Sequence, residues 1–234
     1  MSKDWIKGRG QESLETDAKD NSSSVDFGPQ RFWMKPETST QIVFCDDDPL
    51  RFYEHQIAIF NPKTGKMDFR NWGTCPGAET CPMCKEGDEP AFVAAWSVLD
   101  RTEFTYKHGE KAGQTSKDNL RLFVAKPKVM TKLARRSKKA KAKGHTTGLT
   151  GLVFEVARGD GKSPNTGDDF ELMGDGTKLL AGVKLPDYEA IFAPNMKRLQ
   201  RFAAILKERR EHGEDKKAEA PADSSKPEVD EIPF

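Results

Sequence analysis

The cysteine-rich stretch from Cys75 to Cys84 constrains this chain more than any other part of its sequence. It reads Cys-Pro-Gly-Ala-Glu-Thr-Cys-Pro-Met-Cys and holds three of the four cysteines among 234 residues. Two cysteines separated by two residues can place both thiolates on one metal ion within a single turn. A disulfide framework would spread its cysteines along the chain, so this clustering indicates a metal site in a reducing compartment.

Three thiolates require a fourth ligand, and the sequence offers two candidates, His55 and Cys45. His55 is favoured because it precedes the cysteine-rich stretch by about one strand, although zinc sites of both compositions occur. Nitrogen and sulfur ligands at these separations suit zinc. Four protein ligands leave no position for water, so we expect a structural ion. The rival interpretation, a redox Cys-x-x-Cys pair, would not need Cys75 nearby.

The charges are strongly segregated, although the net charge is only +1. Residues 119–154 contain ten Lys or Arg and no Asp or Glu, whereas residues 214–234 contain seven acids and three lysines. Such asymmetry predicts a basic binding face and a separate acidic tail.

Three regions are expected along the chain: a flexible N-terminal arm over 1–29, a folded core over 30–212 and a disordered acidic tail over 213–234. The apolar fraction is 35% and the charged fraction 32%, which is typical of a chain that is partly unfolded. The N-terminus lacks the apolar run of a signal peptide, and no stretch is long enough to span a bilayer. We therefore expect an intracellular protein.

The hydrophobic pattern predicts a mainly β core with a few helices. A helix is expected to begin at Pro127, and another over 187–211, interrupted at Pro194. Short strands separated by turns, together with a metal-binding insertion at about 55–90, indicate a small β-barrel. The strands are expected over residues 40–44, 53–60, 92–99, 103–106, 120–124, 149–157 and 169–173.

A basic helix or loop is expected at about 126–145. Such a run is often only a solvated surface, but this one contains no acids and lies between strands rich in aromatic residues. Cations that neutralise phosphates, beside rings that stack on unpaired bases, are what a single-stranded nucleic acid requires. Trp72 and Tyr106 are the preferred stacking rings. The preferred cations are Lys126, Lys128, Lys132, Arg135 and Arg136.

No arrangement of side chains favours an enzyme. Asp46, Asp47 and Asp48 could hold Mg²⁺ as in a two-metal nuclease, but a surface turn before Pro49 is the simpler interpretation. The sequence Gly-Lys-Ser at 161–163 lacks the first glycine of a phosphate-binding loop. We expect a binding protein.

The last residues change abruptly from acidic to apolar. They read Glu-Val-Asp-Glu-Ile-Pro-Phe and end on an aromatic side chain beside the terminal carboxylate. Such a tip can dock into an apolar pocket with a basic rim on a partner protein. The predicted partner-binding residues are Asp230, Glu231, Ile232, Pro233 and Phe234.

The chain resembles the zinc-containing single-stranded DNA-binding proteins of bacteriophages, of the T4 helix-destabilising type. The resemblance is carried by His55, Cys75, Cys81-Pro-Met-Cys84 and the Gly87-Asp88 pair, and extends loosely over residues 30–210. The C-terminal tip separately resembles that of bacterial single-stranded DNA-binding proteins, which recruits replication and repair partners.

These resemblances imply an OB-fold barrel with an inserted zinc-binding subdomain. They imply structural Zn²⁺ held by His55, Cys75, Cys81 and Cys84. They also imply a protein that coats single-stranded DNA without strong sequence specificity, in phage replication, recombination and repair within the host cytoplasm. The N-terminus shows no clear basic self-association motif, which puts cooperative filaments in doubt. The alternative function is a zinc-ribbon adaptor that binds duplex DNA or proteins.

Overall fold

The computed structural model describes residues 29–61, 65–105 and 112–211. The described chain is mainly antiparallel β-sheet with a few helices, which confirms the expected class. The strands are β1 (Thr38–Phe44), β2 (Leu50–Asn61), β3 (Lys66–Thr74), β4 (Ala91–Asp100), β5 (Phe104–Thr105), β6 (Thr115–Ser116), β7 (Asn119–Ala125), β8 (Leu152–Arg158) and β9 (Asp169–Asp175). The helices are α1 (Pro82–Lys85), α2 (Pro127–Ala142), the 3₁₀ turn η1 (Thr177–Leu180), α3 (Tyr188–Ile191) and α4 (Met196–Glu211).

Strand β4 is the centre of the sheet. One edge of β4 pairs with β7, and the other edge pairs first with β2 and then with β1, all antiparallel. Beyond β1 the order continues to β8 and β9, whereas β3 extends the opposite end from β2. Within the described residues the strands form an open path, so the expected barrel is not closed.

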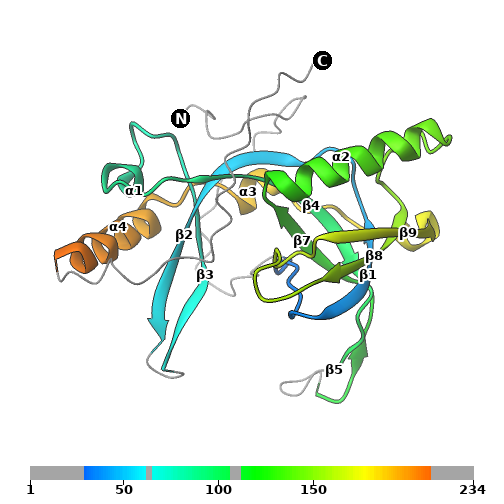
Figure 1. The fold of residues 1–234 in the computed structure, drawn as a ribbon, viewed down its shortest axis with the longest axis horizontal. Helices are drawn as coiled ribbons and strands as arrows, with labels where there is room; N and C mark the ends of the chain where they lie inside the picture. The colour runs from blue at the N-terminus through cyan, green and yellow to red at the C-terminus, as the bar shows by residue number, and fades with distance from the viewer. Residues whose placement is uncertain (1–28, 62–64, 106–111, 212–234) are drawn as a thin grey trace.

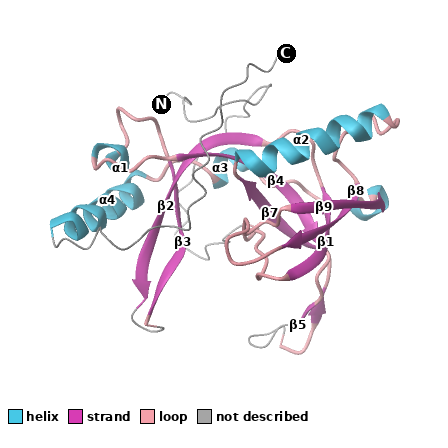
Figure 2. Cartoon of the chain, viewed as in Figure 1, coloured by secondary structure: helices cyan, strands magenta, loops and turns pink. Residues whose placement is uncertain are grey.

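Two halves of the molecule share β4 (Figure 1). In one half, helix α2 packs on β4 and β7 over the principal core, where buried aromatic side chains meet. In the other half, β2 and β3 form a long hairpin with α1 and α4 beside it (Figure 2). Burial of apolar side chains along α2 and α4 explains why these amphipathic segments are helical despite their many cations.

The loop between β1 and β2 carries the three aspartates considered as a magnesium site. Asp46 accepts hydrogen bonds from the Ser97 amide, at 3.2 Å, and from the buried Tyr188 hydroxyl. Ser97 lies where β4 changes its pairing from β1 to β2, so this carboxylate fills the gap in the ladder. Burial beside Asp46 raises the pKa of Tyr188 well above its usual range, which keeps the hydroxyl a donor.

Asp47 connects the same loop to the end of α2. Its carboxylate accepts from Ser137 Oγ at 3.0 Å and from the Leu149 amide at 2.8 Å, and it pairs with Lys141. Gly148 has φ +64°, and a Cβ built there would lie 2.1 Å from an Asp47 oxygen, so only glycine fits. Asp46 and Asp47 are therefore structural acceptors, and the expectation of a simple surface turn is wrong for these two residues.

Strand β3 was not expected from the sequence, which predicted no strand between residues 60 and 92. The hairpin β2–β3 instead continues up to the first cysteine. Gly73 in β3 explains how α4 comes so close, because a Cβ there would lie 2.7 Å from the Leu199 side chain. As expected, the helical segment near the C-terminus is interrupted around Pro194, between α3 and α4.

Candidate metal centre and basic hollow

The four residues expected to bind zinc come from three adjacent elements. His55 lies on β2, Cys75 follows β3 directly, and Cys81 and Cys84 lie at the start and within α1. The Cys75 amide donates to Tyr53 O at 2.8 Å, which continues the hairpin up to the first thiol. Pro82 occupies the first turn of α1, where its missing N–H costs nothing.

The side-chain distances fit a tetrahedral ion. Zinc bonded to sulfur at about 2.3 Å and to nitrogen at about 2.0–2.1 Å would hold its ligand atoms about 3.5–3.8 Å apart. Cys75 Sγ lies 3.7 Å from Cys84 Sγ. His55 Nε2 lies 3.5 Å from Cys84 Sγ and 3.2 Å from Cys81 Sγ. All four ligand atoms lie within 4.8 Å of one another, so they form a compact possible metal site.

The surroundings also favour a cation. Three of the four residues are buried. Burial and the neighbouring Cys75 sulfur raise the pKa of Cys84 to about 12, and burial raises the pKa of Cys75. A bound divalent ion would displace the thiol protons and compensate the resulting charge.

The choice between His55 and Cys45 is decided by position. Cys45 is buried in a separate cluster with Val43, Leu99 and Val153. Burial and the adjacent Asp46 raise the Cys45 pKa to about 12. His55 is 1% exposed and points its Nε2 at the thiols. The structure brings together His55 and the three clustered cysteines, and it leaves Cys45 out.

Asp88 is a further residue of this centre. Its Oδ2 lies 2.5 Å from His55 Nδ1, on the side of the ring away from the thiols. A carboxylate on Nδ1 fixes the tautomer that leaves Nε2 free to bind a metal. The one signal for Asp88 in the sequence is its place in the Gly87-Asp88 pair, just after the last cysteine.

We expect Asp88→Asn to weaken zinc binding by about 10- to 100-fold, as changes in such outer carboxylates do. Competition with a chromophoric chelator would measure the affinity. Glu89→Gln, the neighbouring exposed carboxylate, is the matched control and should retain wild-type affinity. Equal affinities for the two variants would contradict a role for Asp88.

A hydrophobic cluster connects the metal centre to α4. Cys75, Cys81 and Met83 pack against Leu199 and Phe202. At the other end of α4, Arg210 donates to Glu86 O and Arg209 donates to Ala58 O. The cysteines thus form part of the core of this half of the molecule, so a metal bound by them would be coupled to the docking of α4.

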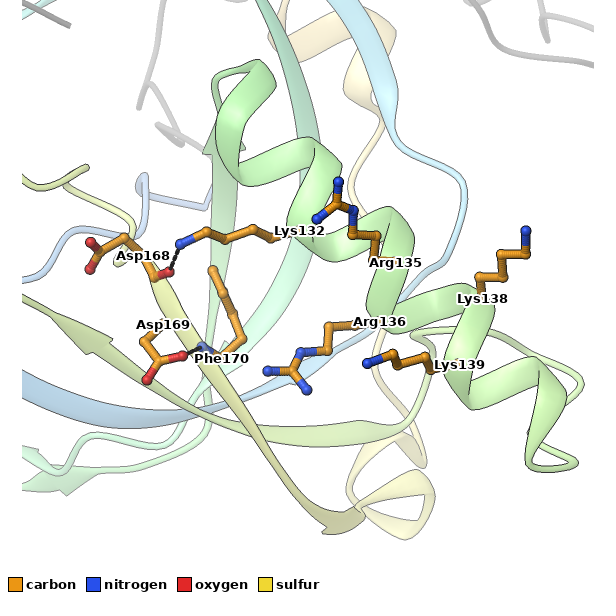
Figure 3. A pocket seen from close by; sticks show the side chains of 8 residues that line it. All are labelled: Lys132, Arg135, Arg136, Lys138, Lys139, Asp168, Asp169 and Phe170. Atoms are coloured by element: carbon orange, nitrogen blue, oxygen red, sulfur yellow. Dashed lines mark hydrogen bonds between the residues drawn. The ribbon is translucent and has the colours of Figure 1, made fainter. Parts of the chain in front are cut away.

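The basic segment forms a hollow of about 430 Å³ between α2 and β9 (Figure 3). We call it the basic hollow; its lining residues are Lys132, Arg135, Arg136, Lys138, Lys139, Asp168, Asp169 and Phe170. The cations outnumber the carboxylates five to two. No ion pair joins any of the five cations to an acid within the described chain, so their charge is available to an anionic ligand.

The spacing of cations along α2 explains why they line the same hollow. Lys132, Arg136 and Lys139 follow one another at four and three residues, which places them on one face of α2. Figure 3 shows these three side chains reaching toward β9, with Lys132 donating to the backbone carbonyl of Asp168. Lys132, Arg135 and Arg136 were predicted from the sequence as phosphate-binding residues. Lys138 and Lys139 were not, although the same helical spacing could have identified them.

The other predicted nucleic-acid residues are scattered. Lys126 and Lys128 are exposed at the beginning of α2, outside the hollow. Trp72 on β3 is partly buried, with the Arg31 guanidinium 4.2 Å from its ring centroid. Tyr106 and the tail residues 230–234 lie outside the described residues. Nucleic-acid binding by Lys126, Lys128, Trp72 and Tyr106 stays a prediction, as does partner binding by the tail residues.

No protein-family model, curated protein or solved structure matches this chain. Among the helices of the described ranges, none is long and apolar enough to cross a membrane.

Proposed function

We propose that this chain is a zinc-stabilised protein that binds single-stranded DNA through the basic hollow. The observation that carries the proposal is the set of five cations on α2 without carboxylate partners in the described chain. A backbone of phosphates neutralises such a surface and releases counterions, which drives binding without reading sequence.

An OB-fold core accords with this function. Five strands lie side by side in the order β7-β4-β1-β8-β9. In chain order β7 is the third of these five strands and β8 the fourth, and α2 lies between them. The OB-fold has such a helix between its third and fourth strands, and OB-folds commonly bind single-stranded nucleic acids. The resemblance to phage single-stranded DNA-binding proteins supports the same interpretation and suggests roles in replication, recombination and repair.

Zinc is the proposed ion, with a structural role. His55, Cys75, Cys81 and Cys84 supply one nitrogen and three sulfurs at separations that suit a tetrahedral ion. Four protein ligands leave no site for substrate or water. The ion would hold α1 and the β2–β3 hairpin together, and it contributes no catalytic chemistry.

A titration with oligo-dT and with a matched duplex, at several salt concentrations, tests the function. Tight binding to oligo-dT that weakens steeply with salt is the expected result. Equal or better binding to duplex would favour the adaptor alternative. A lack of binding to either ligand would reject the proposal.

The acidic tail is proposed to compete with DNA for the basic hollow and to recruit partner proteins. Residues 214–234 carry seven acids against three lysines. Truncation after Gly213 should therefore tighten oligo-dT binding at low salt, where Coulomb interactions are least screened, and have little effect at high salt. Fluorescence anisotropy with labelled oligo-dT would measure both. Identical affinities at low salt would contradict tail competition.

A further inference from the structure

The segment Gln30–Met34 is extended and lies along β7. Phe32 N donates to Leu122 O at 2.8 Å, and Leu122 N donates to Gln30 O at 3.0 Å. Side chains alternate along such a segment. Phe32 and Met34 are each 4% exposed and belong to the principal core. The opposite face therefore presents Arg31 and Trp33, and the Trp33 ring is 54% exposed.

The segment that carries Trp33 lies beside the loop before β9, whose residue Asp168 lines the basic hollow. The Arg158 guanidinium carbon is 5.8 Å from the Trp33 ring centroid, and Arg158 donates to the carbonyl of Met34. A Cβ on Gly167 would lie 3.3 Å from Met34 Sδ, so residues 33–34 and 167–168 are neighbours. Asp168 lines the hollow, and its carbonyl accepts from Lys132. The exposed indole is thus carried by a segment that contacts the loop at the Asp168 end of the hollow.

On the same outer face, Arg31 has a second arginine as its neighbour. Arg31 makes two hydrogen bonds to Glu54, at 3.1 and 2.6 Å, while its guanidinium stacks over Trp72. Arg198 lies at the beginning of α4. The next residue, Leu199, packs against Gly73, the neighbour of Trp72 in β3. Burial and the charge of Arg31 together lower the pKa of Arg198. Among the described residues no carboxylate pairs with Arg198. Glu54 compensates the charge of Arg31, which leaves the positive charge of Arg198 without a carboxylate in the described chain.

We propose that the outer face of Gln30–Met34 is a nucleotide subsite, in which Trp33 stacks on an unpaired base and Arg31 with Arg198 holds a backbone phosphate. The inference rests on the proposed single-stranded DNA binding and extends it. The strand then runs from the basic hollow past Trp33 toward the start of α4. Rings stack on any base, and guanidiniums neutralise phosphate, so the subsite takes single strands irrespective of sequence.

Trp33→Ala tests the stacking ring. Binding of the full chain to fluorescently labelled oligo-dT, followed by anisotropy, should weaken by about tenfold or more, because base stacking on one ring contributes on that order. The salt slope should stay unchanged, since no phosphate contact is lost. Trp33→Phe should keep most of the affinity because it retains a ring. Phe60→Ala, which removes an equally exposed ring at the end of β2, is the matched control and should bind as wild type.

Arg198→Gln should lower the salt slope by about 0.7, the contribution of one phosphate on a single strand. If wild type binds oligo-dT but Trp33→Ala binds as tightly, the subsite is wrong while the proposed function stands. If Trp33→Phe binds no better than Trp33→Ala, stacking is rejected as the role of this ring. Failure of wild type to bind oligo-dT rejects the function and the subsite together.

Discussion

Cys81→Ala is expected to abolish stoichiometric zinc binding and to destabilise the half of the molecule that contains α1 and α4. Cys81 is fully buried, lies 3.2 Å from His55 Nε2 and belongs to the cluster that holds α4. Binding to the folded state alone stabilises it by about 4 kcal/mol when free zinc exceeds the Kd a thousandfold. The free energy of unfolding should fall by at least about 4 kcal/mol. The amide protons of α4 should also exchange faster than in wild type. Metal analysis and thermal unfolding measure the two effects.

Cys45→Ala is the matched control, since Cys45 is another buried thiol but belongs to a different cluster. It removes a sulfur from the core and should cost some stability, yet retain one zinc per chain. A strong chelator added to wild type should reproduce the Cys81→Ala unfolding curve, because metal binding and folding are linked. An unchanged curve after complete removal of the metal would disprove the structural role.

The cysteine spacing alone was enough to predict most of this centre, because ligands close in sequence are close in any fold. The fourth ligand could not be predicted in this way, because it is distant from the cysteines in sequence. His55 is joined to the cysteines by the register of the hairpin, which pairs it with Gly73 two residues before Cys75. That register depends on strand β3, whose sequence lacks a clear alternation. The sequence therefore favoured His55 over Cys45 as the fourth ligand, but it could not decide between them.

The aromatic residues show a second limit of prediction from the sequence. The run Arg31-Phe-Trp-Met34 gives no hint of which side faces the core until its pairing with β7 is known. Phe32 and Met34 then face inward, and Trp33 faces outward. Helix α2 was easier to predict, because its periodicity is local: Val129 and Leu133, four residues apart, are both buried. Local spacing predicts helices and metal turns, whereas exposure on a strand depends on distant partners.

The double variant Arg136→Gln, Lys139→Gln is expected to cause the largest loss of oligo-dT binding. Both side chains reach from α2 into the basic hollow, and neither has an ion-pair partner in the described chain (Figure 3). Each phosphate contact adds about 0.7 to the salt slope, so the slope should fall by about 1.4. That change corresponds to a loss of about tenfold to a hundredfold in affinity near 50 mM salt. Anisotropy titrations across a salt series give both quantities.

Lys178→Gln, Lys207→Gln makes the same change in net charge at exposed positions that do not line the hollow. This control should weaken binding only slightly, through the overall potential of the protein. Lys132 is left intact in both variants because it holds the carbonyl of Asp168 and so supports the hollow itself. If the salt slope falls equally in the two double variants, binding responds to net charge alone and the contacts with DNA must lie elsewhere. A lower slope confined to the α2 variant would instead identify the hollow as the place where phosphates are neutralised.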